Sequence, residues 1–190
     1  GVQTCALPIL SPFFIENLKK ITTVPIDVHL MVNHPEDIIP MCLEAGADII
    51  SFHPETANNK IFRLLNQIKD AGKKCGVVLN PATPAESIAE YAHLLDKVTV
   101  MSVDPGYAGQ KFIPESLNKI RKLINMRKNN GYHYLTEIDG SCNEKTFGQI
   151  AESGVDVFIV GTSGLFSLHE DVSQAWDRMI EIFQRETVAA

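Results

Sequence analysis

Two short stretches decide the fold: "EAGADI" at residues 44–49 and "ESGVDV" at residues 152–157. Both follow one pattern, in which Glu, a small residue and Gly precede an apolar residue, Asp and a β-branched residue. A Gly after a helix is a common C-terminal cap, and β-branched residues favour strands. The two stretches therefore predict a repeated unit in which a helix ends and the next strand begins.

Six short apolar runs predict the strands of this repeated unit. Each is nearly continuously apolar, which is typical of a parallel sheet covered on both faces. The runs are Ile26–Met31, Asp48–His53, Cys75–Leu79, Val98–Val103, Tyr134–Ile138 and Asp156–Val160. Amphipathic patterns between them, for example at residues 58–72, 114–126 and 172–183, predict helices. Alternating strands and helices indicate an α/β fold, either a doubly wound sheet or a (β/α)8 barrel.

The spacing of the runs favours a barrel without its first units. Their starts give (156 − 26)/5 = 26 residues per unit. Eight such units need about 208 residues, whereas the chain has 190. Ahead of Ile26 there is room for one helix, "SPFFIENLKKITT" at residues 11–23, and ten further residues. We therefore expect one α/β domain, a (β/α)8 TIM barrel lacking its first strand, first helix and second strand.

Composition narrows the function classes. The chain is 45% hydrophobic and 21% charged, as in soluble globular proteins, and its net charge of −6 argues against nucleic acid as a partner. No apolar run has the length of a membrane span, and no signal peptide is visible. Four scattered cysteines without C-x-x-C spacing indicate reduced thiols: Cys5, Cys42, Cys75 and Cys142. We expect a cytoplasmic protein without a membrane partner.

Polar side chains gather where the predicted strands end, and in (β/α)8 barrels chemistry takes place at those ends. The residues there are His29, Met31, His53, Asn80, Met101, Asp104, Asp139, Gly161 and Thr162. In "YLTEIDGSCN", residues 134–143, a buried strand ends in Asp139, and a buried carboxylate is costly unless its charge is compensated. Together these positions predict an active-site rim.

Glycine-containing loops follow three of the strands. "DPGYAGQKF" covers residues 104–112, Gly140-Ser141 follows Asp139, and "VGTSGLF" covers residues 160–166. Backbone N–H groups and a helix N-terminus in such loops suit a phosphate group. His29 and Asp139 are metal-ligand types, but a catalytic zinc usually needs three or four protein groups. The spacing alone leaves metal binding open.

Several longer motifs carry a resemblance to one family. They are "DVHLMV" (27–32), "HPET" (53–56), "VVLNPATP" (77–84), "MSVDPGYAGQKFIP" (101–114), "EIDGSCN" (137–143) and "GVDVFIVGTSGLF" (154–166). Together they resemble the ribulose-phosphate 3-epimerase family of metal-dependent barrels, from about Leu10 to near Gln184. The resemblance implies reversible inversion at C3 of a 2-ketose phosphate by two Asp carboxylates, which also bind a divalent cation together with two His residues.

The resemblance carries roles to particular positions. It implies that His29 and Asp139 bind the metal, which could be zinc, manganese, cobalt or magnesium, and that Asp139 is also a catalytic acid/base. It implies apolar pocket lining by Met31 and Met101. The implied substrate and phosphate contacts are His29, Gly106, Tyr107, Ala108, Gly109, Gly140, Ser141, Gly161, Thr162 and Ser163.

The substrate branch is also suggested by motifs. "LSPFF", "HPET", "DGSCN" and "VGTSGLF" resemble the hexose-phosphate branch, which converts D-allulose 6-phosphate to D-fructose 6-phosphate in allose catabolism. Pentose-phosphate members more typically carry a double Gly after the Asp and a Gly-Ser later. Two alternatives stay open, namely a ribulose-phosphate substrate and a metal-independent phosphate-binding barrel. The sequence also leaves open whether the protein is a homo-oligomer.

One part of the family pattern is missing from the 190 residues. The family's second strand carries His-x-Asp-x-Met-Asp-Gly, which supplies the other metal-binding His and the second catalytic Asp, and no such motif occurs here. "GVQTCALPI" at residues 1–9 has no counterpart in the family. We expect residues 1–9 to be a foreign or artefactual segment, residues 10–190 to be the barrel domain, and this chain to be weakly active or inactive.

Overall fold

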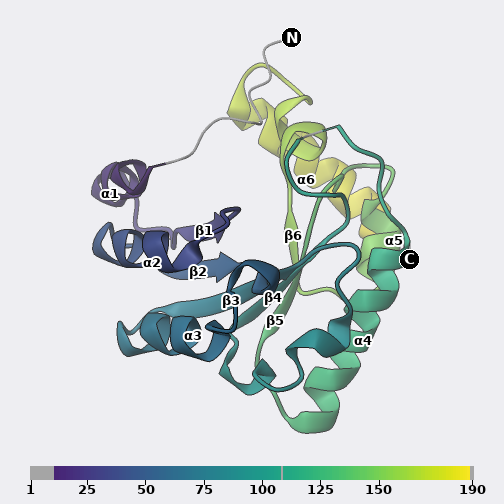
Figure 1. Cartoon of the computed structure of the whole chain (residues 1–190). Helices are drawn as coiled ribbons and strands as arrows, with labels where there is room; N and C mark the ends of the chain where they lie inside the picture. Colours follow the sequence, from purple (N-terminus) through teal and green to yellow (C-terminus); the bar gives the residue numbers. More distant parts are fainter. Residues whose placement is uncertain (1–10, 108, 189–190) are drawn as a thin grey trace.

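The computed structural model describes residues 11–107 and 109–188, so the prediction for residues 1–9 lies outside the described residues. Six parallel strands form one curled sheet in the order β1-β2-β3-β4-β5-β6 (Figure 1). They are β1 (Asp27–Leu30), β2 (Ile49–Phe52), β3 (Lys74–Leu79), β4 (Lys97–Met101), β5 (Leu135–Asp139) and β6 (Val157–Ile159). The structure confirms the α/β fold and all six predicted strands, curled as in part of a TIM barrel.

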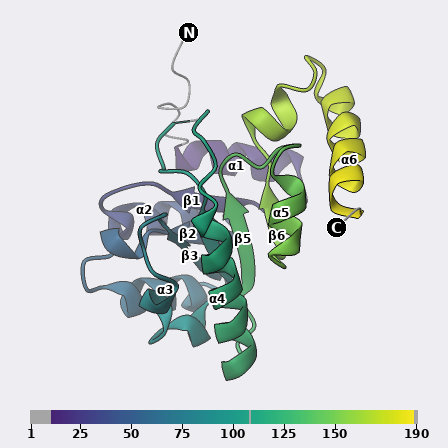
Figure 2. The same cartoon turned by 90° about the vertical axis from the view of Figure 1, so that its right-hand side faces the viewer.

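The helices lie on the outer side of the curled sheet (Figures 1 and 2). They are α1 (Pro12–Ile21), α2 (Pro35–Glu44), α3 (Ile61–Asp70), α4 (Glu115–Asn130), α5 (Phe147–Glu152) and α6 (Val172–Val188). Between β3 and β4 the connection is made by two short turns, η2 (Ala85–Ile88) and η3 (Ala92–Leu94), in place of a long helix. None of the described helices is long and apolar enough to cross a membrane.

The apolar stripe of α3 shows why these helices form. Leu64, Leu65 and Ile68 are at most 1% exposed and belong to the main hydrophobic core, while the exposed residues of the helix are polar apart from Phe62. Burying one such side chain contributes roughly 1.5–3 kcal/mol, far more than helix propensity alone. The sheet's outward residues, among them Val77, Leu79 and Val98, belong to the same core.

Aspartates that immediately precede a strand fix the start of the strand before it. In three units an Asp Oδ2 accepts a hydrogen bond from a backbone N–H at the start of the preceding strand. The pairs are Asp48–Ile26 at 2.8 Å, Asp96–Cys75 at 2.9 Å and Asp156–Thr136 at 2.7 Å. The first and last of these aspartates belong to the repeated sequence pattern, whose glycines, Gly46 and Gly154, have positive φ angles as helix caps should.

This aspartate clamp is expected to stabilise the fold. Asp48 also pairs with Lys19 at 2.9 Å, and the hydrogen bond from Ile26 N–H is the main reason that the pKa of Asp48 lies below its usual value. We expect Asp48→Ala to lower the free energy of unfolding by about 2 kcal/mol at pH 7, because hydrogen bonds to charged groups contribute roughly 1.5–3 kcal/mol. Urea denaturation measures this difference.

The effect should depend on pH. The depressed pKa means that the stabilisation is present above the unfolded-state pKa, near 4, and is lost as the pH falls through the lower folded-state pKa. Glu16→Ala is the control, because Glu16 forms an exposed pair with Lys20 and should contribute less than about 1 kcal/mol. An Asp48→Ala variant no less stable than Glu16→Ala would contradict the clamp.

Candidate functional site

A cavity of about 320 Å³ lies at the carboxyl ends of the strands, among the loops that follow β4, β5 and β6. Its lining includes Met31, Met101, Gly106, Tyr107, Gly109, Asp139, Gly140, Ser141, Gly161, Thr162 and Ser163, which were all predicted as site residues. His29 is not part of this lining, and Ala108 lies outside the described residues. The structure thus brings most of the predicted residues into one cavity, while their individual roles stay predictions.

Asp139 is the ionisable group at the centre of this arrangement. It is the last residue of β5, and burial raises the pKa of its carboxyl group to about 6, with the nearby charge of Glu137 adding to the rise. The positive charge of Lys97 and a hydrogen bond from the Gly140 N–H oppose this effect. A carboxylate with such a pKa is mostly ionised at pH 7 and still basic enough to accept a proton.

The backbone around Asp139 is held in place by β4. The N–H of Ser102 donates to the Asp139 carbonyl at 2.8 Å, and its hydroxyl donates to the Gly140 carbonyl at 2.5 Å. Gly140 has a φ of +114°, and a Cβ there would lie 2.6 Å from Val103 Cγ2. Only glycine fits such a position without displacing the loop, so this turn sets the direction of Asp139.

Hydrogen bonds join the three loops around the cavity. The Ser141 hydroxyl donates to the Gln110 carbonyl at 2.5 Å, and Gln110 Nε2 donates to the Tyr107 carbonyl at 3.0 Å. Asn143 Nδ2 donates to the Ser141 carbonyl at 3.0 Å and lies 3.3 Å from Ser163 Oγ. A hydroxyl has one proton to donate, so in this geometry Ser141 would contact a phosphate through its backbone N–H.

The element after β6 is short. Gly161 is followed by η4 (Thr162–Phe166), a single turn of 5 residues whose last N–H groups bond to Gly161 and Thr162 carbonyls. The first N–H groups of any helical turn have no partner within the turn, so they are available to an anion. A turn this short has little macrodipole, so the N–H groups themselves would provide the attraction.

His29 contacts another histidine, His53. Its Nε2 lies 2.9 Å from Nε2 of His53, and the two rings are tilted by 39° with centroids 4.9 Å apart. Burial lowers the pKa of His29 to about 3, helped by the neighbouring His53 and Lys97, and burial also lowers the pKa of His53. Both imidazoles are therefore neutral at pH 7.

A charged network that the sequence did not predict lies inside the curl. Lys97 Nζ pairs with Glu137 Oε1 at 2.8 Å and also contacts Asp27 Oδ2, and Thr99 Oγ1 donates to Glu137 at 2.7 Å. Lys97 and Glu137 side chains are only 7% and 6% exposed. Lys97 begins β4 directly before the apolar run from Val98, a position where a lysine is usually exposed, so the sequence offered only a weak signal.

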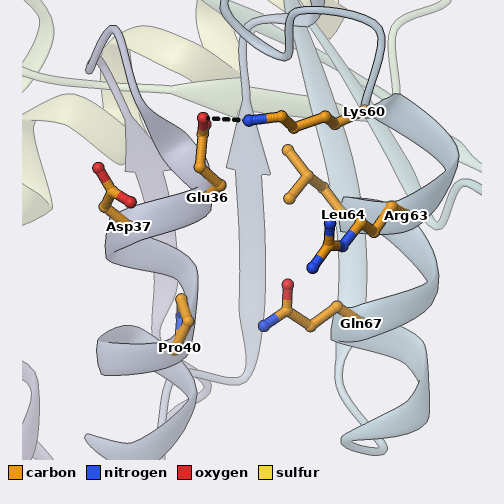
Figure 3. Close-up of a pocket in the computed structure, with 7 residues that line it drawn as sticks. All are labelled: Glu36, Asp37, Pro40, Lys60, Arg63, Leu64 and Gln67. Atoms are coloured by element: carbon orange, nitrogen blue, oxygen red, sulfur yellow. Dashed lines mark hydrogen bonds and ion pairs between the residues drawn. The ribbon is translucent and has the colours of Figure 1, made fainter.

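A second hollow of about 360 Å³ lies between α2 and α3 on the outside of the fold (Figure 3). Glu36 from α2 and Lys60, beside α3, form an ion pair of 2.8 Å across it. Arg63 and Gln67 of α3 and Pro40 of α2 also line it. None of the predicted site residues contributes to this hollow, so the cavity beside Asp139 is the better candidate.

Comparison with known proteins gives a family match that includes the loops around the cavity. A model of the Ribulose-phosphate 3 epimerase family matches residues 8–166, which include every strand and the three loops. The chain belongs to the ribulose-phosphate 3-epimerase family. Proteins named ribulose-phosphate 3-epimerase from Buchnera aphidicola (subsp. Schizaphis graminum) and Aquifex aeolicus are 42% identical over 158 residues and 41% identical over 160 residues, respectively.

The alignments with these family members cover 83% and 84% of this chain, and 68% and 71% of the relatives. The ribulose-phosphate 3-epimerase of Escherichia coli strain K12 is 40% identical over 155 residues, which cover 81% of this chain and 68% of the relative. These relatives carry the pentose-phosphate name. They establish the family, while the expected preference for allulose 6-phosphate stays a prediction.

Solved structures agree on the fold alone. A mutant tryptophan synthase alpha-subunit from Pyrococcus furiosus superposes with a TM-score of 0.64 at 13% identity, covering 92% of this chain and 71% of that structure. At this identity the likeness says nothing of the reaction. It supports the barrel-like arrangement of the strands.

The side chains in the described residues do not form a complete donor set for the divalent metal that the family implies. Within residues 11–107 and 109–188, no group of three or more His, Cys, Asp or Glu side chains could hold a metal ion. The Nε2 of His29 is already engaged by His53. The described residues therefore do not fit a metal ion on their own, and no step of the reaction is assigned to one.

The raised pKa of Asp139 leads to a stability prediction for this family member. A folded-state pKa near 6, above the unfolded value near 4, means that stability is lost as the pH rises through 6. Asn carries no charge, so Asp139→Asn should be more stable than the wild type by about 2 kcal/mol at pH 8, with no gain near pH 4, because one pKa unit corresponds to about 1.4 kcal/mol.

Urea denaturation in EDTA-containing buffer at the two pH values measures this difference. Asp37→Asn is the matched control, because Asp37 is an exposed carboxylate beside the outer hollow. A gain for Asp139→Asn of the same size at both pH values would show that ionisation of Asp139 is not the cause.

Proposed function

We propose that this chain carries the Asp139 half of the acid/base machinery of a 2-ketose-phosphate 3-epimerase. The observation that carries the proposal is the raised pKa, about 6, of the one carboxyl group that ends β5 within a cavity lined by three glycine-containing loops. Membership of the epimerase family supports the reaction type. The cavity provides a base beside a polar, backbone-lined recess of a size that suits a small sugar phosphate.

The proposed chemistry is a proton transfer at C3. The ionised Asp139 accepts the C3 proton, and the electrons of the broken C3–H bond move into a C2–C3 double bond as the C2 carbonyl becomes an enediolate. Return of a proton to the opposite face inverts C3, and a single carboxylate cannot reach both faces. The second acid/base that the family implies is not among the 190 residues.

Other parts of the cavity support substrate binding. Backbone N–H groups at Gly161–Ser163 and Gly140-Ser141 are proposed to bind the phosphate, and Met101, which is 4% exposed, lines the apolar side. Gln110 and Asn143 hold the loops at fixed distances, so that the phosphate contacts and Asp139 act on one bound molecule. A metal ion would need ligands in addition to His29 and Asp139.

The first candidate substrate is a ribulose phosphate, represented by ribulose 5-phosphate, since the relatives at 40–42% identity are named ribulose-phosphate 3-epimerase. The second is allulose 6-phosphate, which a specific observation favours. Ser141 keeps a side chain at a φ of +50°, directly after Gly140, where the resemblance leads one to expect a second glycine in pentose-phosphate members. A non-glycine residue in this conformation is strained, so its side chain has some compensating contact.

Solvent deuterium exchange tests the proposed reaction. We expect the chain to incorporate deuterium at C3 of a ketose phosphate from one face, with little inversion, and Asp139→Asn to reduce the incorporation at least about a hundredfold, the usual contribution of a general base. NMR of the recovered sugar phosphate measures both exchange and inversion. Asp37→Asn should behave as the wild type, and full-rate inversion by these 190 residues would overturn the proposal of a single carboxylate.

Competition between the two substrates tests the specificity. If ribulose 5-phosphate is the substrate, it should bind about tenfold more tightly than allulose 6-phosphate, since one extra carbon group in a fitted pocket is worth roughly 1–3 kcal/mol. Isothermal titration calorimetry measures both affinities. Tighter binding of allulose 6-phosphate than of ribulose 5-phosphate would favour the hexose-phosphate candidate, provided that Ser141→Gly reduces this preference. A metal-dependent increase in either affinity would count against a metal-independent barrel.

A further inference from the structure

Lys97 is a buried lysine with carboxylate partners on two other strands. Its side chain is 7% exposed, its Nζ lies 2.8 Å from Glu137 Oε1 on β5, and the same Nζ contacts Asp27 Oδ2 on β1. Lys97 itself begins β4, so a single ammonium group joins three strands. An ammonium group has three N–H donors, which is enough to bond both carboxylates at once.

A glycine beside Lys97 leaves room for its side chain. Gly76 of β3 lies in register with Ser51 of β2 and with Lys97 of β4. Its φ is not positive, so its backbone conformation does not require glycine. A Cβ at this position would lie 2.5 Å from Ser51 Oγ and 3.4 Å from Lys97 Cβ. Glycine within a strand costs roughly 0.5–1 kcal/mol relative to alanine, and here it keeps open the space through which Lys97 reaches β1.

The sheet by itself restrains the distance between β1 and β5 only weakly. Among the described strands β1 pairs with β2 alone, and it lies at one end of the curled sheet (Figure 1). The distance across the curl therefore depends on the angles between successive strands, which vary by tens of degrees among sheets. The two ion pairs of Lys97 restrain this distance directly.

The cavity lies farther along the same two strands, toward their carboxyl ends. Side chains alternate along a strand, so Asp27 and Met31 point to the same side of β1. For the same reason Glu137 and Asp139 point to the same side of β5. At about 3.3 Å per residue, the two cavity residues lie about 7 to 13 Å beyond the two carboxylates. Both Met31 and Asp139 line the cavity, so a restraint on the carboxylates also restrains its walls.

We propose that Lys97 is a positioning residue, whose two ion pairs tie β1 to β5 and so set the width of the cavity between Met31 and Asp139. A buried ion network adds little net stability, because desolvation offsets its attraction, whereas its contact distances define one spacing of the strands. The width decides how far Asp139 stands from a substrate held between the two walls. This consequence for the reaction rests on the proposed function, but the width itself does not.

Crystal structures of variants prepared in EDTA-containing buffer measure the width. In Lys97→Met, which keeps the length of the side chain but not its charge, nothing draws the two carboxylates together. We expect the Cα–Cα distance between Met31 and Asp139 to increase by about 1 Å, a displacement large enough to affect catalysis. Asp27→Ala should give the same increase. This variant keeps the buried pair of Lys97 with Glu137, so the test stands if Lys97→Met does not fold.

Two further variants separate positioning from a general loss of structure. Lys122→Met is the matched control, because Lys122 forms an exposed pair with Glu86 at 2.9 Å, and it should leave the width unchanged. Asp27→Glu keeps a carboxylate within reach of the flexible lysine and should retain the wild-type width. The proposal is wrong if Lys97→Met or Asp27→Ala folds with the wild-type width, or if Asp27→Glu widens the cavity as much as Asp27→Ala. In solution, the NMR signal of the Met31 methyl group should shift in the same variants.

Kinetics distinguish this inference from the proposed function. In Asp27→Ala, kcat for deuterium exchange at C3 of ribulose 5-phosphate should fall about tenfold, because misplacement by about 1 Å can cost up to a hundredfold. The affinity for inorganic phosphate should stay unchanged, since the proposed phosphate contacts follow β5 and β6. A loss of phosphate affinity as large as the loss in kcat would overturn the positioning role. A widened cavity in the variants, with no exchange in the wild type, would count against the proposed function alone.

Discussion

The hydrogen bond from a backbone N–H at the start of one strand to the aspartate before the next strand is the constraint on which the rest of this structure depends. It recurs three times, at Asp48, Asp96 and Asp156, and each time it fixes where one strand starts relative to its neighbour. A slip of one residue would turn every inward side chain outward. The clamp therefore decides that Asp139 faces the interior while Ile138 packs in the outer core.

The curl of the sheet brings distant strands into contact. Lys97 of β4 reaches Asp27 of β1, although β2 and β3 lie between these strands in the sheet. Buried ion pairs lose much of their attraction to desolvation, so this network is weak evidence for stability. One effect on the site is electrostatic, because the charges of Glu137 and Lys97 shift the pKa of Asp139 in opposite directions.

The cavity of this ribulose-phosphate 3-epimerase family member combines a base at the end of a strand with walls made of loops. Asp139 sits at the end of a strand, whereas its surroundings are loops tied together by Gln110, Ser141 and Asn143. This division suits a site in which the position of the carboxylate is fixed by the sheet and the shape of the substrate is matched by the loops. Substitutions in the loops should accordingly alter specificity more readily than the proton transfer itself.

The sequence by itself determined the strands, their parallel order and the residues at their carboxyl ends. Those features follow from local patterns: apolar runs such as Cys75–Leu79, glycine caps such as Gly46, and the loops after Met101 and Asp139. The apolar runs also predicted a parallel sheet covered on both faces, and they gave no sign of the charged groups on the inner face, such as Lys97 and Glu137.

Only the tertiary structure decided three contacts. They are the pairing of His29 with His53, the ion pair of Lys97 with Asp27, and the hydrogen bond from the Ser141 hydroxyl to the Gln110 carbonyl. Each of these contacts joins residues that lie 24 to 70 positions apart in the chain. Sequence periodicity can assign a side chain to a face of its own element. The partner across the curl depends on the curvature and stagger of the whole sheet, which no local pattern encodes.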